Sequence, residues 1–395
     1  MSWFRILLFG ILPVLVTQGL DFDYLRKVYL RIKKEYVEPV DDKKSLEAAI
    51  QGILSGLDSY SYYLNSEEFK NFSEDIEGKY SGIGIELKNQ FNSYLVLSVL
   101  DDSPALKAGL KPGDRILEVN GEKVHRMSIS EVVSKIRGPS GTEVNLKILR
   151  SIEQRDQELH FTVTRGLIHI RPVTVKVFGD GIIYLRISKF VSGVGSEIKA
   201  ALKDLRFKKN RGLVIDVRSN PGGLLEESIK VANIFLPRGL IVETRSRHKD
   251  QQKKYYATES VGIRHLPCLI LIDSGTASAG EILAGALKDN GYCFAAGEKT
   301  FGKGSVQTAI SLPDNSALVL TTAYYFTKSG KKIEGEGIEP DFEVSNPNKD
   351  YLFSLEDWRN KSSEDYLAKD PVFRFAMEKI NELTFIGEDE VDQKG

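Results

Sequence analysis

The stretch LILIDSGTASAGEILAGALKDNG, residues 269–291, decides the fold of the second half of the chain. Its first four residues form a continuous apolar run, which is typical of a strand buried on both faces. A polar loop follows, and Ile282, Leu283, Ala286 and Leu287 then recur at the spacing of one helix face. The stretch therefore predicts a buried strand, a loop and a helix in direct succession.

The same alternation continues on both sides of this stretch. Apolar runs predict strands at residues 182–187, 213–217 and 293–297, and helical spacing predicts helices around 198–205 and 225–236. Such alternation is typical of an α/β layer whose parallel strands are joined by right-handed crossovers. The sequence therefore predicts an α/β core, for which we take residues 166–345.

Three polar loops follow the expected strands, at residues 219–223, 274–278 and 298–304. In a parallel sheet, ligands collect beyond the carboxyl ends of the strands, where the free amides of helix starts point. Parallel strands would place all three loops at one edge of the sheet. We expect the functional site at that edge.

The first half of the chain has a different pattern. Residues 21–79 show helical spacing and form the expected N-terminal helical arm, and residues 346–395 form an expected helical C-terminal tail. Residues 80–165 instead predict a β-rich module, in which the hairpin signal Asn120-Gly121 joins two short strands. Ser128 and Glu131 are spaced as a capping box before one helix of this module.

Composition limits the classes of protein that fit. The 395 residues suffice for two or three domains, and 41% hydrophobic with 28% charged residues excludes a disordered chain. A net charge of -1 predicts no preference for nucleic acid.

The chain has two cysteines, Cys268 and Cys293, and both lie in apolar runs. We therefore expect two buried core thiols and no disulfide framework.

The amino terminus resembles a secretory signal. After Arg5, the uncharged apolar run from Ile6 to Val16 is followed by the polar residues Thr17 and Gln18. This run is short for a permanent span, which needs about 20 apolar residues. Residues 1–20 are therefore expected to export the chain to the periplasm or cell envelope, either as a cleaved leader or as a short membrane anchor, and any membrane contact is expected there.

Two residues near the expected sheet edge could carry nucleophilic chemistry. Ser278 is spaced with Glu281 as a helix-capping pair. It could also be a nucleophile at a helix start, where the amide of Ala279 could donate a hydrogen bond to the oxyanion of the reacting carbonyl. Lys303 lies between two glycines, where it could be a surface turn residue or a general base. A base must be neutral, which requires burial to lower the lysine pKa by roughly 3 units.

Two rival interpretations use the same region. A Ser/His/Asp triad would need His248 or His265 as the base, yet none of the five histidines lies in a strand-end loop with a carboxylate nearby. The spacing Gly297-x-x-x-x-Gly302-Lys303 is close to a phosphate-binding loop, but glycine at 304 has no hydroxyl for magnesium. Residues 305–312 also alternate as a strand where that motif needs a helix.

The combination of motifs resembles the carboxyl-terminal processing peptidases, also called tail-specific proteases. The matching segments are LVIDVRSNPGGLL at 213–225, SGTASAGEILAGALKDNG at 274–291, GEKTFGKGSVQ at 297–307 and EGEGIEPD at 334–341. The resemblance implies that Ser278 is the nucleophile, Lys303 the general base and Gln307 the residue that orients the lysine. It further implies an oxyanion hole of backbone amides from Ala279 and from Gly222 or Gly223, with no metal or cofactor.

This chain departs from the family pattern at a few positions. The family usually has serines where this chain has Thr276 and Gly280, and commonly an arginine where it has Tyr292. These differences concern the surroundings of the expected site, because the serine, lysine and glutamine are all present.

The β-rich module resembles a PDZ domain, through Gly82, Ile83, Gly84 and Ile85 and through SPALKAGLKPGDRILEVNG at 103–121. The resemblance implies that amides of the 82–85 loop hold the terminal carboxylate of a peptide, with residues 128–137 as the groove helix. The implied partners are protein or peptide substrates with a free carboxyl terminus. Apart from this resemblance, the helical arm is expected to be a packing surface or the contact surface of a homodimer. The alternative function is an inert PDZ scaffold or adaptor.

Overall fold

The computed structural model describes residues 22–76, 79–90, 93–99, 103–111, 113–127, 129–152, 155–169, 172–178, 181–203, 205, 210–258, 266–345, 367 and 369–392. The expected leader at 1–20, the capping residue Ser128 and His265 lie outside the described residues, as does most of the expected tail before 367. The chain divides into two compact units, Met1–Ser59 and Tyr60–Gly395.

The first unit contains two helices, α1 (Phe22–Glu35) and α2 (Asp42–Ser55). Asp41 caps α2, because its side chain accepts hydrogen bonds from the amides of Lys43 and Lys44. Only Leu54 of these two helices is buried, whereas many large apolar side chains are exposed. These exposed side chains include Phe22, Tyr24, Leu25, Leu30, Ile32, Leu46, Ile53 and Leu57. No described helix of the chain has the length and apolar composition needed to cross a bilayer.

The β-rich module has the expected pattern of antiparallel strands. One sheet has the strand order β3-β4-β5-β7-β8, with β6 paired to β5, and a separate ribbon pairs β2 with β9. Asn120 and Gly121 both have positive φ and form the predicted turn between β5 and β6. The elements are β2 (Lys79–Gly82), β3 (Ile85–Gln90), β4 (Ser93–Val99), α4 (Pro104–Ala108), β5 (Arg115–Val119), β6 (Glu122–Lys123), η1 (Val124–Arg126), α5 (Ile129–Ile136), β7 (Glu143–Ile152), β8 (Arg155–Thr164) and β9 (Gly166–His169).

The core sheet confirms the predicted α/β layer. Its order is β10-β11-β12-β15-β16-β19, in which β11 to β19 are parallel and β10 is antiparallel to β11. The strands are β10 (Val173–Phe178), β11 (Ile182–Ile187), β12 (Gly212–Asp216), β15 (Cys268–Ile272), β16 (Phe294–Gly297) and β19 (Phe342–Glu343). The helices are α6 (Val194–Lys203), α7 (Leu225–Phe235), α8 (Ala279–Asp289) and α11 (Pro371–Asp392).

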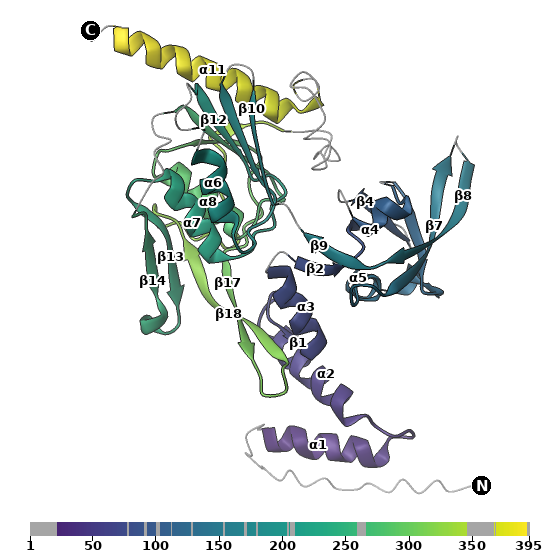
Figure 1. Cartoon of the computed structure of the whole chain (residues 1–395). Coiled ribbons are helices and arrows are strands. Elements are labelled where there is room, and N and C mark those ends of the chain that lie inside the picture. The colour runs from purple at the N-terminus through teal and green to yellow at the C-terminus, as the bar shows by residue number, and fades with distance from the viewer. Residues whose placement is uncertain are drawn as a thin grey trace, which may run out of the picture. The chain divides into compact units, whose positions relative to one another are not determined.

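Helices cover both faces of this sheet, which explains its continuous apolar runs. Ile215 and Ile270 belong to the core cluster formed with α6, α7 and α8, whereas the alternate residues Val214 and Leu269 belong to the cluster formed with α11 (Figure 1). Phe373 of α11 is completely buried in the second cluster. Each central strand is therefore buried on both faces, as the sequence predicts.

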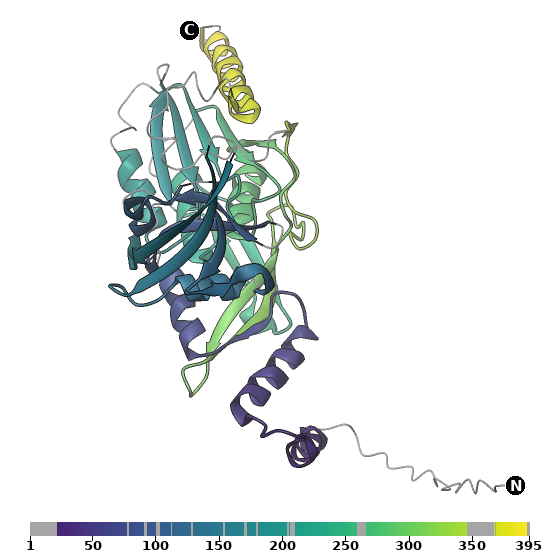
Figure 2. The same ribbon diagram turned by 90° about the vertical axis from the view of Figure 1, so that its right-hand side faces the viewer.

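A second sheet carries the segment that follows the candidate lysine. Its order is β1-β18-β13-β14, and β17 pairs with β18 in a long ribbon (Figures 1 and 2). The observed β17 confirms the strand expected after Lys303 and excludes the helix that a phosphate-binding loop would need. The further elements are β1 (Tyr62–Leu64), α3 (Ser66–Ile76), β13 (Leu240–Ser246), η3 (Lys249–Gln251), β14 (Lys253–Tyr256), β17 (Ser305–Ser311) and β18 (Ala317–Phe326).

A buried charge network fixes the end of β12. Burial alone would raise the pKa of Asp216, but Arg218 and Arg186 lower it to about 2. Arg218 also donates to Asp370, whose carboxylate caps the first turn of α11. The network therefore joins the sheet, the C-terminal helix and the residue directly before the 219–223 loop.

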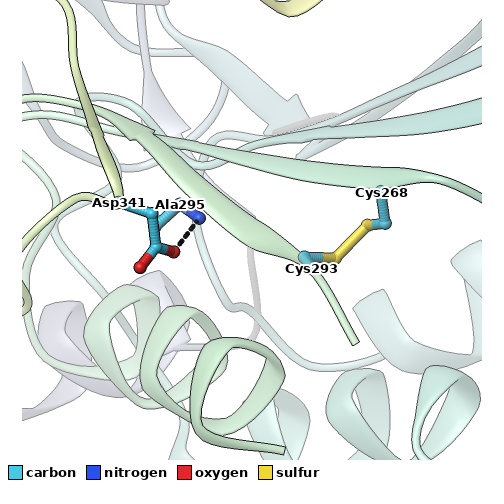
Figure 3. Close-up of a disulfide and its surroundings, with 4 residues drawn as sticks. All are labelled: Cys268, Cys293, Ala295 and Asp341. Carbon is cyan, nitrogen blue, oxygen red and sulfur yellow. Dashed lines mark hydrogen bonds between the residues drawn. A yellow bond between two sulfur atoms is a disulfide. The ribbon is translucent and has the colours of Figure 1, made fainter. Parts of the chain in front are cut away.

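The expectation of two core thiols is wrong, because Cys268 and Cys293 form a disulfide (Figure 3). Cys268 begins β15, and Cys293 directly precedes β16. The two strands pair in parallel with Leu269 opposite Phe294, so the preceding residues also lie side by side. The apolar runs indicated burial correctly, but the sequence alone did not show that these two runs are neighbours.

Candidate active site

Ser278 lies in a sharp turn between β15 and α8. Its backbone has φ 53° and ψ -115°, a conformation that costs a non-glycine residue energy. The turn is held on both sides, because the amide of Ala277 donates to the carbonyl of Asn220 and the amide of Ile282 donates to that of Ser278. A strained strand-to-helix turn of this kind presents a serine hydroxyl at the edge of a sheet.

The loop after β12 packs directly on this serine. Gly222 has φ 102°, and a Cβ atom there would lie 2.7 Å from Cβ of Ser278 and 3.0 Å from the amide nitrogen of Ala279. A side chain at position 222 is therefore excluded. The prediction that the loops after β12 and β15 meet at one edge is confirmed by this close approach.

The two glycines of this loop differ as hydrogen-bond donors. The amide of Gly222 already donates to Oδ1 of buried Asn220, at 2.8 Å. The backbone bridge between Phe190 and Gly223 consists of two hydrogen bonds. The amide of Phe190 donates to the carbonyl of Gly222, and the amide of Leu224 donates to the carbonyl of Phe190, so the amide of Gly223 takes no part in the bridge. Gly223 is thus the better candidate for an oxyanion donor.

Glu281, in the first turn of α8, joins the serine and lysine loops. One carboxylate oxygen, Oε2, accepts hydrogen bonds from the amides of Ser278 at 2.8 Å and Lys303 at 2.9 Å. The other, Oε1, accepts from the hydroxyl of Thr300 and the amide of Gly302. Burial raises the pKa of Glu281, and these four hydrogen bonds oppose that rise. The backbones of residues 278 and 303 are therefore held beside the same oxygen atom.

Lys303 is half-buried and has two neighbours that sequence reasoning missed. Its Nζ lies 4.9 Å from the centroid of the Tyr60 ring. Burial lowers the pKa of Lys303, and the negative charge of Glu334 opposes that lowering. The sequence showed no carboxylate directly after the lysine, but the fold brings Glu334 back to this loop, where its Oε2 accepts from the amide of Gly304 at 2.7 Å.

Gln307 lies on β17 at an irregularity in its pairing with β18, where the register shifts between Val306 and Gln307. Its amide nitrogen donates to the hydroxyls of Ser305, at 2.9 Å, and Thr321, at 3.2 Å. The structure thus places Gln307 on the strand that leaves Lys303, with its amide group fixed by hydroxyls.

The segment 334–341 supports the lysine loop from the other side. The hydroxyl of Thr300, which donates to Glu281, also accepts from the amide of Ile338 at 2.7 Å. Asp341 exchanges hydrogen bonds with the backbone of Ala295 on β16, as Figure 3 shows for its carboxylate.

The sequence indicated Glu281 only as a helix-capping partner of Ser278, and it gave no signal that Thr300 belongs to the site.

The structure gives the rival interpretations no support in the region that it describes. His248 is exposed beside the turn η3, and its amide donates to Ser246. The other histidine of the triad hypothesis, His265, lies outside the described residues. Among the described side chains, no group of three or more His, Cys, Asp or Glu could hold a metal ion.

The loop 82–85 joins β2 to β3 and packs against the start of α4. The carbonyl of Ile83 accepts from the amide of Ala105, which holds the loop against α4. Gly84 has φ 80°, and a Cβ there would lie 2.4 Å from Cβ of Ser103. The strand β3 that begins at Ile85 stands at the edge of its sheet, with α5 packed against it.

Comparison with known families gives three matches along the chain. Residues 181–344 match the model of peptidase family S41, and residues 95–150 match a PDZ domain. Residues 16–68 match the N-terminal domain of the activating protease CtpB. The three matched regions follow one another in the order of the arm, the β-rich module and the core.

Individual relatives agree with these matches. A carboxy-terminal-processing protease from Bartonella bacilliformis is 40% identical over 324 residues, which cover 81% of this chain and 74% of the relative. The carboxy-terminal processing protease CtpB of Bacillus subtilis is 37% identical over 330 residues, covering 82% and 68%. The solved structure of a photosystem II D1 C-terminal processing protease is 30% identical, with a TM-score of 0.58 and coverage of 83% and 87%. The chain therefore belongs to peptidase family S41, as a carboxy-terminal processing serine protease that carries a PDZ domain.

Proposed function

We propose that this chain is an endopeptidase in which Ser278 is the nucleophile and Lys303 is the general base. The observation that carries the proposal is the shared hydrogen-bond acceptor, because the amides of both residues donate to Oε2 of Glu281. The lowered pKa of half-buried Lys303 supports the same roles, since a base must be available in its neutral form. A histidine is not needed in this scheme.

The proposed reaction proceeds through an acyl-enzyme. Oγ of Ser278 attacks the carbonyl carbon of the peptide bond while neutral Lys303 takes the hydroxyl proton. The lysine then gives that proton to the leaving amine as the C–N bond breaks. Water, deprotonated by the same lysine, attacks the ester and releases the new carboxyl terminus, and the lysine returns the proton to Oγ of Ser278.

Backbone amides would stabilise the negative oxygen of the intermediate. We assign this role to the amides of Ala279 and Gly223, because the amide of Gly222 is engaged by Asn220. Each such donor is worth about 3 kcal/mol in the transition state. Gln307 is proposed to orient Lys303 from β17, with its carbonyl oxygen as the acceptor, since its amide nitrogen is held by Ser305 and Thr321.

Replacement of either proposed catalytic side chain tests these roles. We expect Ser278→Ala and Lys303→Ala to lose cleavage of a denatured test protein by at least about a thousandfold, because each removes a covalent or proton-transfer step. Matched controls are Ser274→Ala, in the exposed part of the serine loop, and Lys299→Ala, whose exposed amine pairs with Glu339. Both controls should cleave at the wild-type rate. Full activity in either catalytic variant would exclude the assignment.

The PDZ domain is proposed to bind the free carboxyl terminus of the substrate. A peptide would add a strand to the free edge of β3, and amides of Gly82, Ile83, Gly84 and Ile85 would receive its carboxylate. The edge position of β3 and the tight packing of Gly84 against Ser103 support this role. Cleavage would then occur upstream of the bound terminus.

Blocking the substrate carboxylate tests this recognition. We expect a substrate ending in a carboxamide to be cleaved at least about tenfold less efficiently than the same substrate with a free carboxylate, because a charged hydrogen bond is lost. The control is the variant Gly84→Val, in which the loop cannot close against Ser103, so that both substrates should be cleaved equally. Equal cleavage of the two substrates by the wild-type chain would contradict the proposed binding mode.

We also propose that the chain is exported to the cell envelope, with residues 1–20 as leader or short anchor, and that two copies pair through α1 and α2. The disulfide between Cys268 and Cys293 supports export, because disulfides persist mainly in oxidising compartments. The exposed apolar side chains of α1 and α2 support pairing, since a second copy could cover them.

Fractionation and sedimentation test this location and assembly together. We expect the chain to be recovered from the envelope with its disulfide formed, and to sediment as a dimer. The double variant Leu25→Asp/Ile32→Asp should sediment as a monomer, because it places charge among the apolar side chains of α1. Recovery from the cytosol with free thiols would contradict export, and an unchanged dimer in the variant would contradict pairing through this helix.

A further inference from the structure

A tyrosine far from Lys303 in the sequence lies against its amine. The Nζ atom of Lys303 is 4.9 Å from the centroid of the Tyr60 ring, within the range of roughly 6 Å for a cation–π contact. The residues after Tyr60 are anchored on β18, because the hydroxyl of Ser61 accepts from the amide of Thr321 and β1 pairs with the start of β18. The position of the ring is therefore set by the same sheet that continues from the lysine loop.

Two opposing influences act on this amine. Burial favours the neutral form, whereas an aromatic face attracts the ammonium form and gains little from a neutral amine. The negative charge of Glu334 acts in the same sense as the ring. The pH at which Lys303 loses its proton therefore depends on the balance between burial and these two neighbours.

We propose that Tyr60 is a positioning residue of the active site, whose ring face holds the ammonium of Lys303 between turnovers and sets the pH at which this amine becomes a base. The proposal rests on the proposed function, since it assumes that neutral Lys303 is the base. Tyr60 itself transfers no proton and contacts no substrate in this scheme.

The direction of the expected effect follows from the charge states. Activity requires neutral Lys303, so kcat/KM should rise with pH and level off above the pKa of this amine. Removing the aromatic face removes support for the charged form, which lowers the pKa. The rise should then move to lower pH by roughly half a unit, so that the neutral fraction well below the inflection is about threefold larger.

The experiment measures kcat/KM as a function of pH for variants that distinguish the effect of the aromatic face of Tyr60 from the effect of its side-chain volume. Tyr60→Leu and Tyr60→Met keep an apolar side chain without an aromatic face, and two such variants guard against one that folds poorly. Tyr60→Phe keeps the face and should retain the wild-type inflection. The matched control Tyr63→Leu changes a neighbouring half-buried tyrosine of β1 that pairs with β18, and it should also leave the inflection unchanged.

The expected result is a downward shift in both Tyr60→Leu and Tyr60→Met, with Tyr60→Phe and Tyr63→Leu at the wild-type value. An unchanged or raised inflection in the two apolar variants would overturn the proposal, as would an equal shift in Tyr60→Phe. Lys303→Ala is measured alongside. If that variant is fully active, the proposed function fails; if it is inactive while the apolar variants keep the wild-type inflection, only the role of Tyr60 fails.

Discussion

One buried carboxylate, that of Glu281, holds the candidate site together. A buried charge is unfavourable unless hydrogen bonds replace its water, and here four donors from two loops do so. Those loops follow different strands, and Glu281 joins them in addition to the hydrogen bond that the amide of Phe301 donates to the carbonyl of Thr276. The strained backbone of Ser278 is supported by the hydrogen bond from its own amide to Glu281, together with those of Ala277 and Ile282.

The geometry behind this shared acceptor comes from strand pairing. The strands β15 and β16 pair in parallel with a constant offset of 25 residues, as in Leu269 opposite Phe294. The disulfide joins two cysteines with the same separation at one end of the pair. Ser278 and Lys303 lie beyond the other end of this strand pair, and they are separated by the same 25 residues as the two cysteines. The strand pair is thus closed at one end by the disulfide, and the loops that follow it are joined at the other end by Glu281.

Much of the fold was predictable because its signals are local. Apolar runs and helical spacing indicated the strands and helices of the core, and the strand-end loops were expected at one edge of the sheet, where Gly222 closely approaches Ser278. Contacts between distant segments were not predictable. Tyr60 and Glu334 are close to Lys303 because of the packing of β18 and of the segment 334–341, which no local pattern indicates. The disulfide likewise depends on the pairing register of β15 and β16.

In the proposed mechanism, Glu281 holds the serine and lysine loops so that Ser278 and Lys303 can react as a pair. The most direct measurement is the rate at which a fluorophosphonate probe labels Ser278, followed by mass spectrometry, in the wild-type chain and in Glu281→Ala and Glu281→Gln. We expect both variants to remain folded by circular dichroism. Labelling should fall by about a hundredfold in Glu281→Ala and by less in Glu281→Gln, because the amide still offers one acceptor oxygen. Labelling of folded Glu281→Ala at the wild-type rate would show that Glu281 does not hold the two loops for reaction.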